Sequence, residues 1–460
     1  MAEVPRGHAG SPAGAIADAP GLALFTDLYE LSMLQAYHAE GMAARAVFSL
    51  FVRRLPEGRN FLLACGLAAV LDYLEALRFA DDDLAYLAGL GRFSDSFLRY
   101  LRGFRFTGNV RAVGEGTPVF ANEPILEIEA PLPEAQLVET FVMNQIHMQT
   151  VLASKAQRVV AAAAGRPVVD FGARRMHGID AAVKAARAFY IAGVSATSNV
   201  LAGARYGIPL AGTMAHSYIQ AHDDEAGAFR AFVRSYPETV LLVDTYDTLA
   251  AIDKVIALAR ALGADFKVRA VRLDSGDLAV LARQVRRLLD DAGLGHVEIF
   301  ASGGLDEHAI AALIAAGAPI DGFGVGTSMG VSSDAPDLDI AYKLCEYAGK
   351  GRLKLSAAKP VLPGRKQVFR VSEGERAVRD VIAGADEDLP GQPLLEYVMR
   401  GGKRLAAGRD DLDDARVRAR EAVARLPSAV RALAPPASPY PVAVSPALAA
   451  FQKQVQERVK

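Results

Sequence analysis

The chain has 460 residues, of which 51% are hydrophobic, and a formal net charge of −2 at pH 7. This length suits two or three domains with a large buried core, and the near-neutral charge gives no support for broad nucleic-acid binding. No apolar run is long enough to span a bilayer. Cys65 and Cys345 lie far apart in apolar segments, which indicates buried thiols in a reducing compartment and argues against a zinc site built from cysteines.

The N-terminal part of the chain predicts a tail followed by an α+β domain. Residues 1–20 are rich in Ala, Gly and Pro and lack the apolar core of a signal sequence, so we expect a disordered tail on a cytoplasmic protein. Residues 21–132 predict a mixed domain in which Thr26 is the N-cap of the first helix. Its expected helices cover 26–41, 60–77 and 81–89, and its expected strands cover 46–53 and short segments between 106 and 128.

Residues 133–335 predict a domain built on a parallel sheet. A long helix is expected from 133 to about 164, because its apolar positions follow helical spacing. Between 168 and 327, six short apolar runs each end in a polar or glycine-rich cluster, and helical segments separate most of them. The clusters are Phe171-Gly-Ala-Arg-Arg, Ala211-Gly-Thr-Met-Ala-His-Ser, Val243-Asp-Thr-Tyr-Asp-Thr, Val271-Arg-Leu-Asp-Ser-Gly-Asp, Phe300-Ala-Ser-Gly-Gly and Phe323-Gly-Val-Gly-Thr-Ser. This alternation predicts a parallel β/α barrel, in which functional residues gather where the strands end.

Residues 336–460 make up the C-terminal segment. Strands are expected over 341–347 and 353–356, and residues 361–382 form a further β-rich stretch. The rest is charged and predicted to be helical, and the chain contains no repeat of fixed period.

The cluster that begins at Val271 carries the strongest functional signal. It places Arg272, Asp274 and Asp277 at the end of an expected buried strand. Arginine can bind a carboxylate or phosphate through two hydrogen bonds, and carboxylates can hold Mg²⁺, directly or through water, beside a phosphate. The alternative is a turn in which Asp277 caps the next helix. We adopt that alternative for Asp277 and a functional interpretation for Arg272 and Asp274.

Two glycine-rich loops follow the last two expected strands. Glycines allow backbone N–H groups to approach an anion closely, and neighbouring hydroxyls add donors. Late loops of a β/α barrel are a common phosphate site. The residues expected to bind phosphate are Ser302, Gly303, Gly304, Gly324, Gly326 and Thr327.

His216 follows Gly212-Thr-Met-Ala at another strand end. A single histidine is often structural, but the position of His216 among the other polar strand ends favours a functional role. His222 lies six residues further on and would not share its helical face, so we expect His222 at the surface and no metal pair. His177 fits either the site or an ordinary loop.

Further candidates leave alternatives open. Of Arg174 and Arg175, we expect one to contact an anion and the other to form a structural ion pair. Phe171 fits a core position or a ring that stacks on a flat ligand. Asp244 and Asp247 are candidate carboxylates, although either fits as the cap of a helix beginning near residue 249.

The chain resembles the nicotinate phosphoribosyltransferases over about residues 24–360. The matching stretches follow one another in the order of the family. They are Thr26-Asp-Leu-Tyr-Glu, Phe171-Gly-Ala-Arg-Arg-Met-His-Gly, Thr197-Ser-Asn-Val-Leu-Ala-Gly, Gly212-Thr-Met-Ala-His-Ser, Val243-Asp-Thr-Tyr-Asp-Thr, Arg272-Leu-Asp-Ser-Gly-Asp and Gly324-Val-Gly-Thr.

The resemblance implies an α/β fold: an irregular parallel β/α barrel flanked by an α+β domain built from the N- and C-terminal segments. It implies a head-to-tail homodimer with each site at the subunit boundary. The implied reaction joins nicotinate to 5-phosphoribosyl 1-pyrophosphate, giving nicotinate mononucleotide and pyrophosphate, in the salvage route of NAD biosynthesis. Mg²⁺ is the expected cofactor and ATP the expected co-substrate, with ATP hydrolysis coupled through a phosphohistidine at the position of His216.

We expect His216, Arg272 and Asp274 to be the catalytic residues. No direct Mg²⁺ ligand is assigned, although Asp274 is a possible contact through Mg²⁺-pyrophosphate. The resemblance implies that Phe171 and Tyr29 sandwich the pyridine ring, with Tyr29 reaching in from the partner subunit; by its sequence context alone, Tyr29 fits a core residue. The other expected substrate contacts are Arg174, Thr213, Ser217, Arg272 and Ser356, of which Ser356 stands where family members often carry threonine.

Two alternatives stay open. One is a related enzyme acting on nicotinamide, which lacks the carboxylate, or on quinolinate, which carries two and requires decarboxylation. The paired Arg174 and Arg175 and the spread of matching stretches favour nicotinate. The other alternative is a non-catalytic nucleotide-binding homologue, against which the presence of His216, Arg272 and Asp274 argues.

Overall fold

The computed structural model describes residues 22–355 and 361–459. They form two compact units: a barrel unit of residues 155–334, and an α+β unit of residues 22–154 together with the described residues from 335 onward. The tail predicted over residues 1–20 lies outside the described ranges. Within these ranges, no helix has the length and apolar character needed to cross a membrane.

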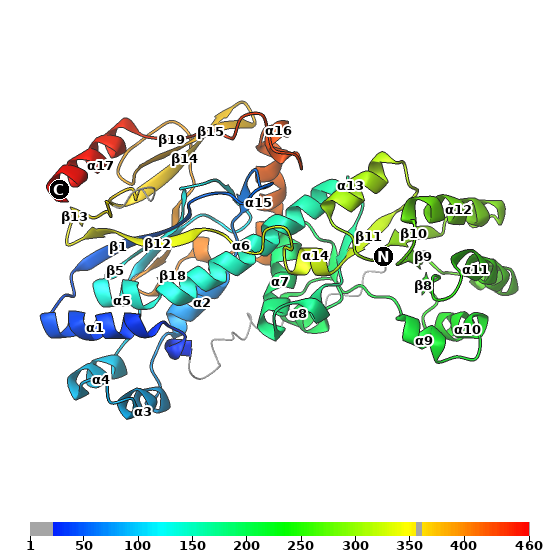
Figure 1. Ribbon diagram of the computed structural model, residues 1–460, viewed down its shortest axis with the longest axis horizontal. Coiled ribbons are helices and arrows are strands. Elements are labelled where there is room, and N and C mark those ends of the chain that lie inside the picture. The colour runs from blue at the N-terminus through cyan, green and yellow to red at the C-terminus, as the bar shows by residue number, and fades with distance from the viewer. Residues whose placement is uncertain (1–21, 356–360, 460) are drawn as a thin grey trace. The chain divides into compact units, whose positions relative to one another are not determined.

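The barrel unit is built on a six-stranded parallel sheet (Figure 1). The strands lie side by side in the order β7 (Ala196–Thr197), β6 (Val168–Asp170), β11 (Gly322–Val325), β10 (Glu298–Ala301), β9 (Ala270–Leu273) and β8 (Val240–Leu242). The helices of the unit are α7 (Ile179–Ile191), α8 (Val200–Tyr206), α9 (His216–Gln220), α10 (Glu225–Ser235), α11 (Thr248–Leu262), α12 (Leu278–Asp291), α13 (Glu307–Ala315) and α14 (Thr327–Gly330). Strands β6 and β11 are buried along their whole length, as expected of the central strands of a parallel sheet whose two faces are both covered. The predicted strand–helix alternation is confirmed.

The barrel is irregular at one edge of the sheet. The strand expected before Ala211 is reduced to one bridge, in which Leu210 pairs with Thr197 of the short strand β7. The physical reason lies in Pro209, which has no backbone N–H to continue a ladder. Its carbonyl oxygen still accepts a hydrogen bond from the Thr197 amide at 3.0 Å. The edge strands β7 and β8 do not pair with each other, so the parallel sheet is a half-barrel and not a closed barrel.

The α+β unit is held together by a sheet to which both ends of the chain contribute. Its strands lie in the order β13 (Lys350–Gly351), β12 (Ile340–Tyr347), β1 (Arg45–Val52), β5 (Pro124–Pro131), β3 (Asn109–Ala112), β17 (Glu396–Arg400) and β18 (Lys403–Arg404). Strand β1 pairs antiparallel with both β12 and β5, so Phe48 lies opposite Leu344 on one side and Ile128 on the other. The predicted domain made from N- and C-terminal segments is confirmed.

Smaller elements complete the α+β unit. A four-stranded sheet has the order β16 (Gln392–Pro393), β14 (Lys366–Glu373), β15 (Arg376–Gly384) and β19 (Val442–Val444), and β2 (Leu62–Leu63) pairs with β4 (Pro118–Val119). The helices are α1 (Leu28–Glu40), α2 (Leu67–Ala76), α3 (Asp81–Gly89), α4 (Asp95–Arg102), α5 (Leu132–Leu137), α6 (Glu139–Ala162), which continues into the barrel unit, α15 (Leu412–Arg425), α16 (Ser428–Arg431) and α17 (Pro446–Val459). One buried cluster joins N- and C-terminal segments through Phe61, Phe120, Leu426, Val430 and Tyr440.

Several predicted boundaries were wrong. Helix α1 begins after Asp27 rather than Thr26, because the Thr26 hydroxyl donates to the Glu30 carboxylate instead of capping. The helix expected from residue 60 begins at Leu67. Gly66 precedes it with a φ of 105°, and a Cβ there would lie 2.5 Å from the Gln145 carbonyl oxygen.

Two further predictions need correction. The single helix expected from 133 to 164 divides at Val138 into α5 and α6. The strand expected over 353–356 does not form in its described part, since residues 353–355 are in neither helix nor strand. Helix α4, which the sequence reasoning did not identify, begins after Ser94, whose hydroxyl accepts a hydrogen bond from the Phe97 amide.

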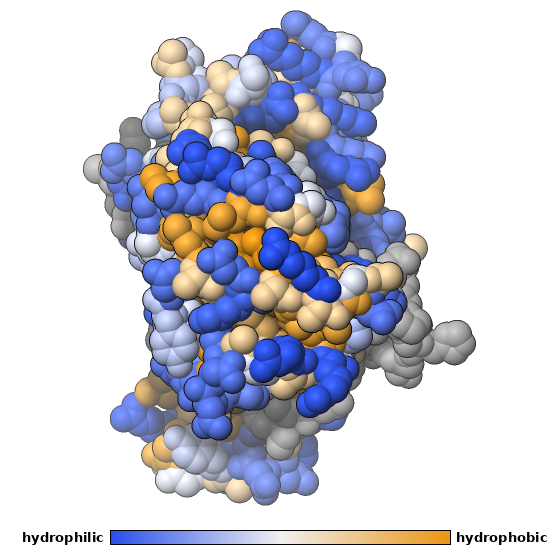
Figure 2. Space-filling model, turned by 90° about the vertical axis from the view of Figure 1, so that its right-hand side faces the viewer, coloured by the Kyte–Doolittle hydropathy of each residue, from blue (hydrophilic) through white to orange (hydrophobic). Residues whose placement is uncertain are grey.

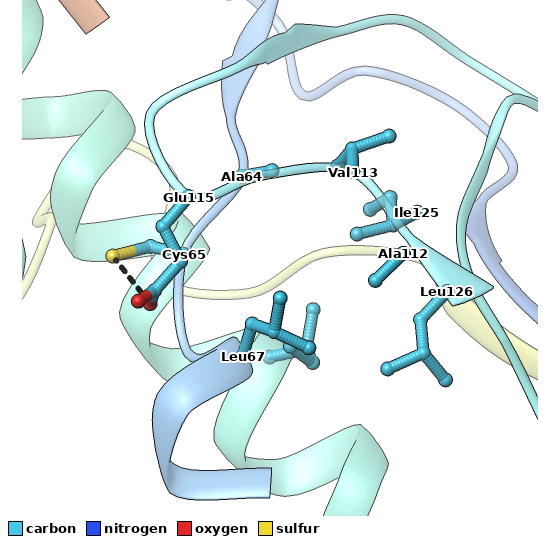
Figure 3. Close-up of a pocket in the computed structure, with 9 residues that line it drawn as sticks. Ala64, Cys65, Leu67, Ala112, Val113, Glu115, Ile125 and Leu126 are labelled. Atoms are coloured by element: carbon cyan, nitrogen blue, oxygen red, sulfur yellow. Dashed lines mark hydrogen bonds between the residues drawn. The ribbon is translucent and has the colours of Figure 1, made fainter. Parts of the chain in front are cut away.

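Both cysteines are buried thiols that form no disulfide, as predicted. Cys65 lines a small apolar pocket of the α+β unit, and its sulfur faces the Glu115 carboxylate at 3.6 Å (Figure 3). Glu115 also accepts a hydrogen bond from the Gly66 amide at 2.6 Å. The pocket has a volume of about 10 Å³, which leaves room for one water molecule at most. This region is therefore part of the core and not a ligand site.

Candidate active site

The carboxyl ends of the barrel strands bring polar residues to one edge of the sheet. Asp170 ends β6, Asp244 follows β8, Arg272 lies in β9 and Ser302 follows β10. All six strands are parallel, so these ends face the same way. The structure joins several of these side chains, and the loop before α9, into one network.

Arg272 is the centre of this network. Its Nε donates to Oγ of Ser302 at 2.8 Å, and its Nη1 donates to Oγ1 of Thr213 at 2.9 Å. Its Nη2 donates to Oδ1 of Asp274 at 2.7 Å. The side chain is 14% exposed. Three of the five N–H donors are thus used to hold the guanidinium in one orientation, and the others remain for a ligand.

Asp274 is held in its ionised form by the same contacts. Ser302 donates to Asp274 Oδ1 at 2.5 Å, in addition to accepting from Arg272. Burial alone would raise the pKa of Asp274. The hydrogen bonds from Ser302 and Arg272, with the charges of Arg272 and His216, outweigh burial and hold this pKa below its ordinary value.

Asp244 is the second carboxylate at this edge. Its Oδ2 accepts hydrogen bonds from the Asp274 amide at 3.0 Å and from the Ser275 hydroxyl at 2.6 Å. Its Oδ1 is buried without a hydrogen-bond partner among the described residues. No group of three or more metal-ligating side chains occurs in the described part of the chain. Asp244 and Asp274 therefore fit an Mg²⁺ ion that arrives with a phosphate ligand and keeps water, but not one enclosed by protein alone.

His216 is the first residue of α9 and lies between two neighbours. Its Nδ1 is 3.1 Å from Oγ1 of Thr245, and its Nε2 is 3.8 Å from Oδ2 of Asp274. The imidazole is 41% exposed. One ring nitrogen is thus engaged by a hydroxyl, the other faces a carboxylate, and the side chain as a whole is partly open to solvent.

Phe171 packs against strand β11 at the position of Gly324. A Cβ on Gly324 would lie 2.5 Å from the Phe171 ring, so only glycine leaves room for the ring in this place. The Arg272 guanidinium carbon lies 5.2 Å from the centre of the ring. An aromatic face and a fixed cation therefore lie side by side.

The glycines of the two loops differ in backbone conformation and in the space beside them. Gly303 has a φ of 92°, and a Cβ there would lie 1.8 Å from the Asp274 carbonyl oxygen, so Gly303 allows two strand-end loops to pack together. Gly304 has a φ of 66° and open space beside it. Gly326 directly precedes Thr327, the first residue of α14. Binding of phosphate by these loops stays a prediction.

The other predicted site residues lie outside the Arg272 network. Arg174 and Arg175 are exposed on a 3₁₀ helix of residues Ala173–Arg175, directly after Phe171. Ser217 is exposed beside His216 on α9. Tyr29 belongs to the α+β unit, where it is 50% exposed rather than in the core. Ser356 lies outside the described residues.

The structural alternatives hold for three residues. Asp247 caps α11 by accepting from the Ala250 amide, and Asp277 caps α12 by accepting from the amides of residues 279 and 280. His222 lies beyond α9, with Nδ1 2.8 Å from the Tyr218 carbonyl oxygen, and takes no part in the network.

Three residues that hold the site in place were not among the predicted site residues: Thr245, Asp170 and Thr197. Thr245 contacts His216, and Asp170 accepts from the Gly172 amide at 2.8 Å and from the Thr197 hydroxyl at 2.7 Å. Burial raises the pKa of Asp170, and these two hydrogen bonds offset only part of the shift. The available signal was their position at the ends of buried strands, where a polar side chain requires a partner.

Comparison with known proteins shows the family to which this chain belongs. The nicotinate phosphoribosyltransferase N-terminal domain matches residues 24–147, and the nicotinate phosphoribosyltransferase family matches residues 167–362. Nicotinate phosphoribosyltransferase pncB2 of Mycobacterium tuberculosis is 60% identical over 423 residues, which cover 92% of this chain and 91% of the relative. The chain belongs to the nicotinate phosphoribosyltransferase family.

Other members and structures of the nicotinate phosphoribosyltransferase type extend this result. The Bacillus subtilis nicotinate phosphoribosyltransferase is 42% identical over 384 residues, covering 81% of this chain and 78% of the relative. The crystal structure of human nicotinic acid phosphoribosyltransferase superimposes with a TM-score of 0.84 at 28% identity, over 93% of this chain and 99% of the human chain. Nicotinate-nucleotide pyrophosphorylase from Pyrococcus furiosus gives a TM-score of 0.72 at 26% identity, covering 88% and 95% of the two chains.

Proposed function

We propose that this protein joins nicotinate to 5-phosphoribosyl 1-pyrophosphate, giving nicotinate mononucleotide and pyrophosphate for NAD biosynthesis. The observation that carries the proposal is the Arg272 guanidinium, fixed by Thr213, Ser302 and Asp274, beside the ring of Phe171. Nicotinate is flat and carries one carboxylate. A fixed guanidinium provides hydrogen bonds for that carboxylate, and an aromatic face packs against the pyridine ring.

The chemistry assigns further roles to the strand ends. The nicotinate ring nitrogen attacks C1 of the ribose, and the bond from C1 to the pyrophosphate oxygen breaks. Positive charge develops on the sugar and negative charge on the leaving group. Mg²⁺, when bound with the pyrophosphate, stabilises that negative charge, and Asp244 and Asp274 are the carboxylates available to it. We assign the 5′-phosphate to the loops at Ser302–Gly304 and Gly326–Thr327, which would orient the sugar for attack.

ATP coupling is assigned to His216. A neutral ring nitrogen attacks the γ-phosphorus of ATP, forms an N–P bond and releases ADP. Thr245 engages Nδ1, which leaves Nε2 as the nucleophile. Nε2 lies 3.8 Å from Oδ2 of Asp274, so a phosphoryl group on Nε2 would lie beside a carboxylate that we assign to the pyrophosphate end of the site. This adjacency supports a link between ATP hydrolysis and the binding of phosphoribosyl pyrophosphate.

We further propose a cytoplasmic homodimer in which Tyr29 of one subunit covers the nicotinate site of the other. Support comes from exposed apolar side chains, which often mark interfaces. The start of the α+β unit exposes Phe25, Leu28 and Tyr29, and the barrel unit exposes Ile179, Val200, Leu201 and Leu210. Apolar side chains also form a band between hydrophilic ones on the face seen in Figure 2. Two buried cysteines that form no disulfide suit a reducing compartment.

One experiment tests the reaction and its alternatives together. Purified protein is incubated with phosphoribosyl pyrophosphate and Mg²⁺, and pyrophosphate release is measured with nicotinate, nicotinamide or quinolinate, each with and without ATP. We expect pyrophosphate release with nicotinate but not with nicotinamide or quinolinate, and a higher rate when ATP is present. Preference for another pyridine would assign the chain to that substrate. No turnover with any of them, together with a ligand-induced rise in melting temperature, would favour the non-catalytic alternative.

A further inference from the structure

A buried group of charges lies in the barrel unit, outside the site described so far. The Lys155 ammonium of α6 lies 2.5 Å from Oε2 of Glu307 and 2.7 Å from Oδ1 of Asp334. Nε of Arg158, one helical turn further along α6, donates to Oε1 of Glu307 at 2.9 Å. The side chains of Lys155 and Glu307 are 2% and 0% exposed. We call this group of two cations and two carboxylates the ionic clamp; its members are Lys155, Arg158, Glu307 and Asp334.

The two carboxylates of the clamp follow the two glycine loops directly. Glu307 is the first residue of α13 and comes three residues after Gly304. Asp334 comes four residues after the end of α14, the short helix that begins at Thr327. The loops are also tied to each other, because Oγ of Ser328 donates to the Leu305 carbonyl oxygen at 2.5 Å. Lys155 thus connects both loops to one rigid helix.

The two cations of the ionic clamp keep Glu307 ionised. Burial alone would raise the pKa of Glu307, but hydrogen bonds from Arg158 and Lys155, with the charge of Lys155, hold it below its ordinary value. A buried carboxylate bound by two cations has few alternative positions. The backbone that follows Gly304 is therefore fixed by side chains that no substrate would touch.

We propose that Lys155 is a positioning residue for the phosphoribosyl end of the site. By holding Glu307 and Asp334 together, it sets the distance between the loop at Ser302–Gly304 and the loop at Gly326–Thr327. Backbone N–H groups bind a phosphate well only when they converge on it. This inference rests on the proposed function, since it assumes that the two loops receive the 5′-phosphate.

The test is Lys155→Met, which removes the charge and keeps much of the side-chain length. This change does not leave a buried carboxylate unpaired, because Glu307 retains Arg158 and Asp334 is 38% exposed. Lys155→Arg is the conservative variant and keeps a cation in place. The matched control is Lys254→Met. Lys254 of α11 pairs at 2.8 Å with Glu225 of α10; their side chains are 39% and 1% exposed, so the control removes a more exposed lysine of the same unit from a carboxylate that is equally buried.

We expect Lys155→Met to raise the KM for phosphoribosyl pyrophosphate about ten-fold or more, with the KM for nicotinate changed less than about two-fold. Lys155→Arg should recover most of the loss, and Lys254→Met should leave both constants near those of the wild type. Equal increases in both constants for Lys155→Met, or the same pattern in Lys254→Met, would show a general structural effect and overturn the inference.

A second readout separates this inference from the proposed reaction. Amide hydrogen exchange, followed by mass spectrometry in the substrate-free protein, reports the order of residues 302–306 and 326–334. Faster exchange in both segments for Lys155→Met, and no change for Lys254→Met, is expected even if the protein uses another substrate. Unchanged exchange in both segments would contradict the positioning role whatever reaction the protein catalyses.

Discussion

The Phe171 ring occupies the space that a side chain on Gly324 would fill. The nearest ring atom lies 2.5 Å from the position of a Cβ on Gly324. Phe171 follows β6 and Gly324 lies in the neighbouring strand β11, paired with Val169. The orientation of the aromatic face therefore depends on a glycine that lies far away in the chain, in a different strand.

Gly324→Ala should displace the Phe171 ring and weaken nicotinate binding. We expect the KM for nicotinate to rise roughly ten-fold, and the free energy of unfolding to fall by about 1–3 kcal/mol from overpacking. Steady-state kinetics and urea denaturation measure these effects. The matched control is Gly322→Ala in the same strand, where a Cβ would meet Phe300 at 3.0 Å instead. A similar rise in the nicotinate KM for both variants would contradict the assignment.

Arg272→Lys should lower kcat/KM about 100-fold, although the charge is retained. Lysine has a single nitrogen and cannot donate from three separate nitrogens to Ser302, Thr213 and Asp274, so the planar fork that holds these groups in one arrangement is lost. The measurement is kcat/KM for nicotinate. Arg269→Lys removes the same fork from a more exposed ion pair with Glu238 and should have little effect. Activity within a few-fold of the wild type in Arg272→Lys would rule out a central role.

Thr245→Val should uncouple ATP from the reaction in part, and His216→Ala should do so completely. The valine keeps the shape of threonine but removes the hydroxyl that engages Nδ1 of His216, so Nε2 is no longer held toward Asp274. Incorporation of the γ-phosphoryl group of labelled ATP into protein is the measurement. His222→Ala is the control and should label normally, since His222 contacts Tyr218 through a hydrogen bond and a ring contact and takes no part in the Arg272 network. Normal labelling of His216→Ala would place the phosphoryl group elsewhere.

Glu30 gives a pH dependence of stability that is separate from the barrel site. Burial, opposed by the hydrogen bond from Thr26 and reinforced by the nearby charge of Glu139, raises the pKa of Glu30 from 4.5 to about 7. The folded state then binds more protons than the unfolded state between these values. The free energy of unfolding should therefore fall as pH rises from about 4.5 to about 7, by up to about 3 kcal/mol.

Glu30→Gln tests this dependence, because glutamine cannot ionise. The difference in the free energy of unfolding between the wild type and Glu30→Gln should grow in favour of the variant as pH rises through this range, and become constant above about pH 8. Urea denaturation at a series of pH values measures it. Glu134→Gln is a useful comparison, since burial also raises the pKa of Glu134. A difference that does not change with pH would show that Glu30 titrates as it does in the unfolded chain.

Much of the barrel and its site could be predicted from local sequence. The apolar runs before Asp170, Asp244, Arg272, Ser302 and Gly326 have the length of buried strands, and the polar residues that end them are visible by inspection. Parallel pairing then places those ends at one edge, whatever the detailed packing. The caps of α11 and α12 at Asp247 and Asp277 were also predictable from local sequence, because a cap depends on its nearest neighbours along the chain.

The sequence by itself determined the strand–helix alternation, the polar strand ends and the family, because all three are recorded in residue order. Tertiary structure decided where α2 begins, why Leu210 forms only a bridge, which hydroxyls hold Arg272 and His216, and that Lys155 meets both Glu307 and Asp334. Each of these depends on atoms far apart in the chain that meet only when the core packs. Periodicity and propensity report local preferences, and long-range contacts override them when the two conflict.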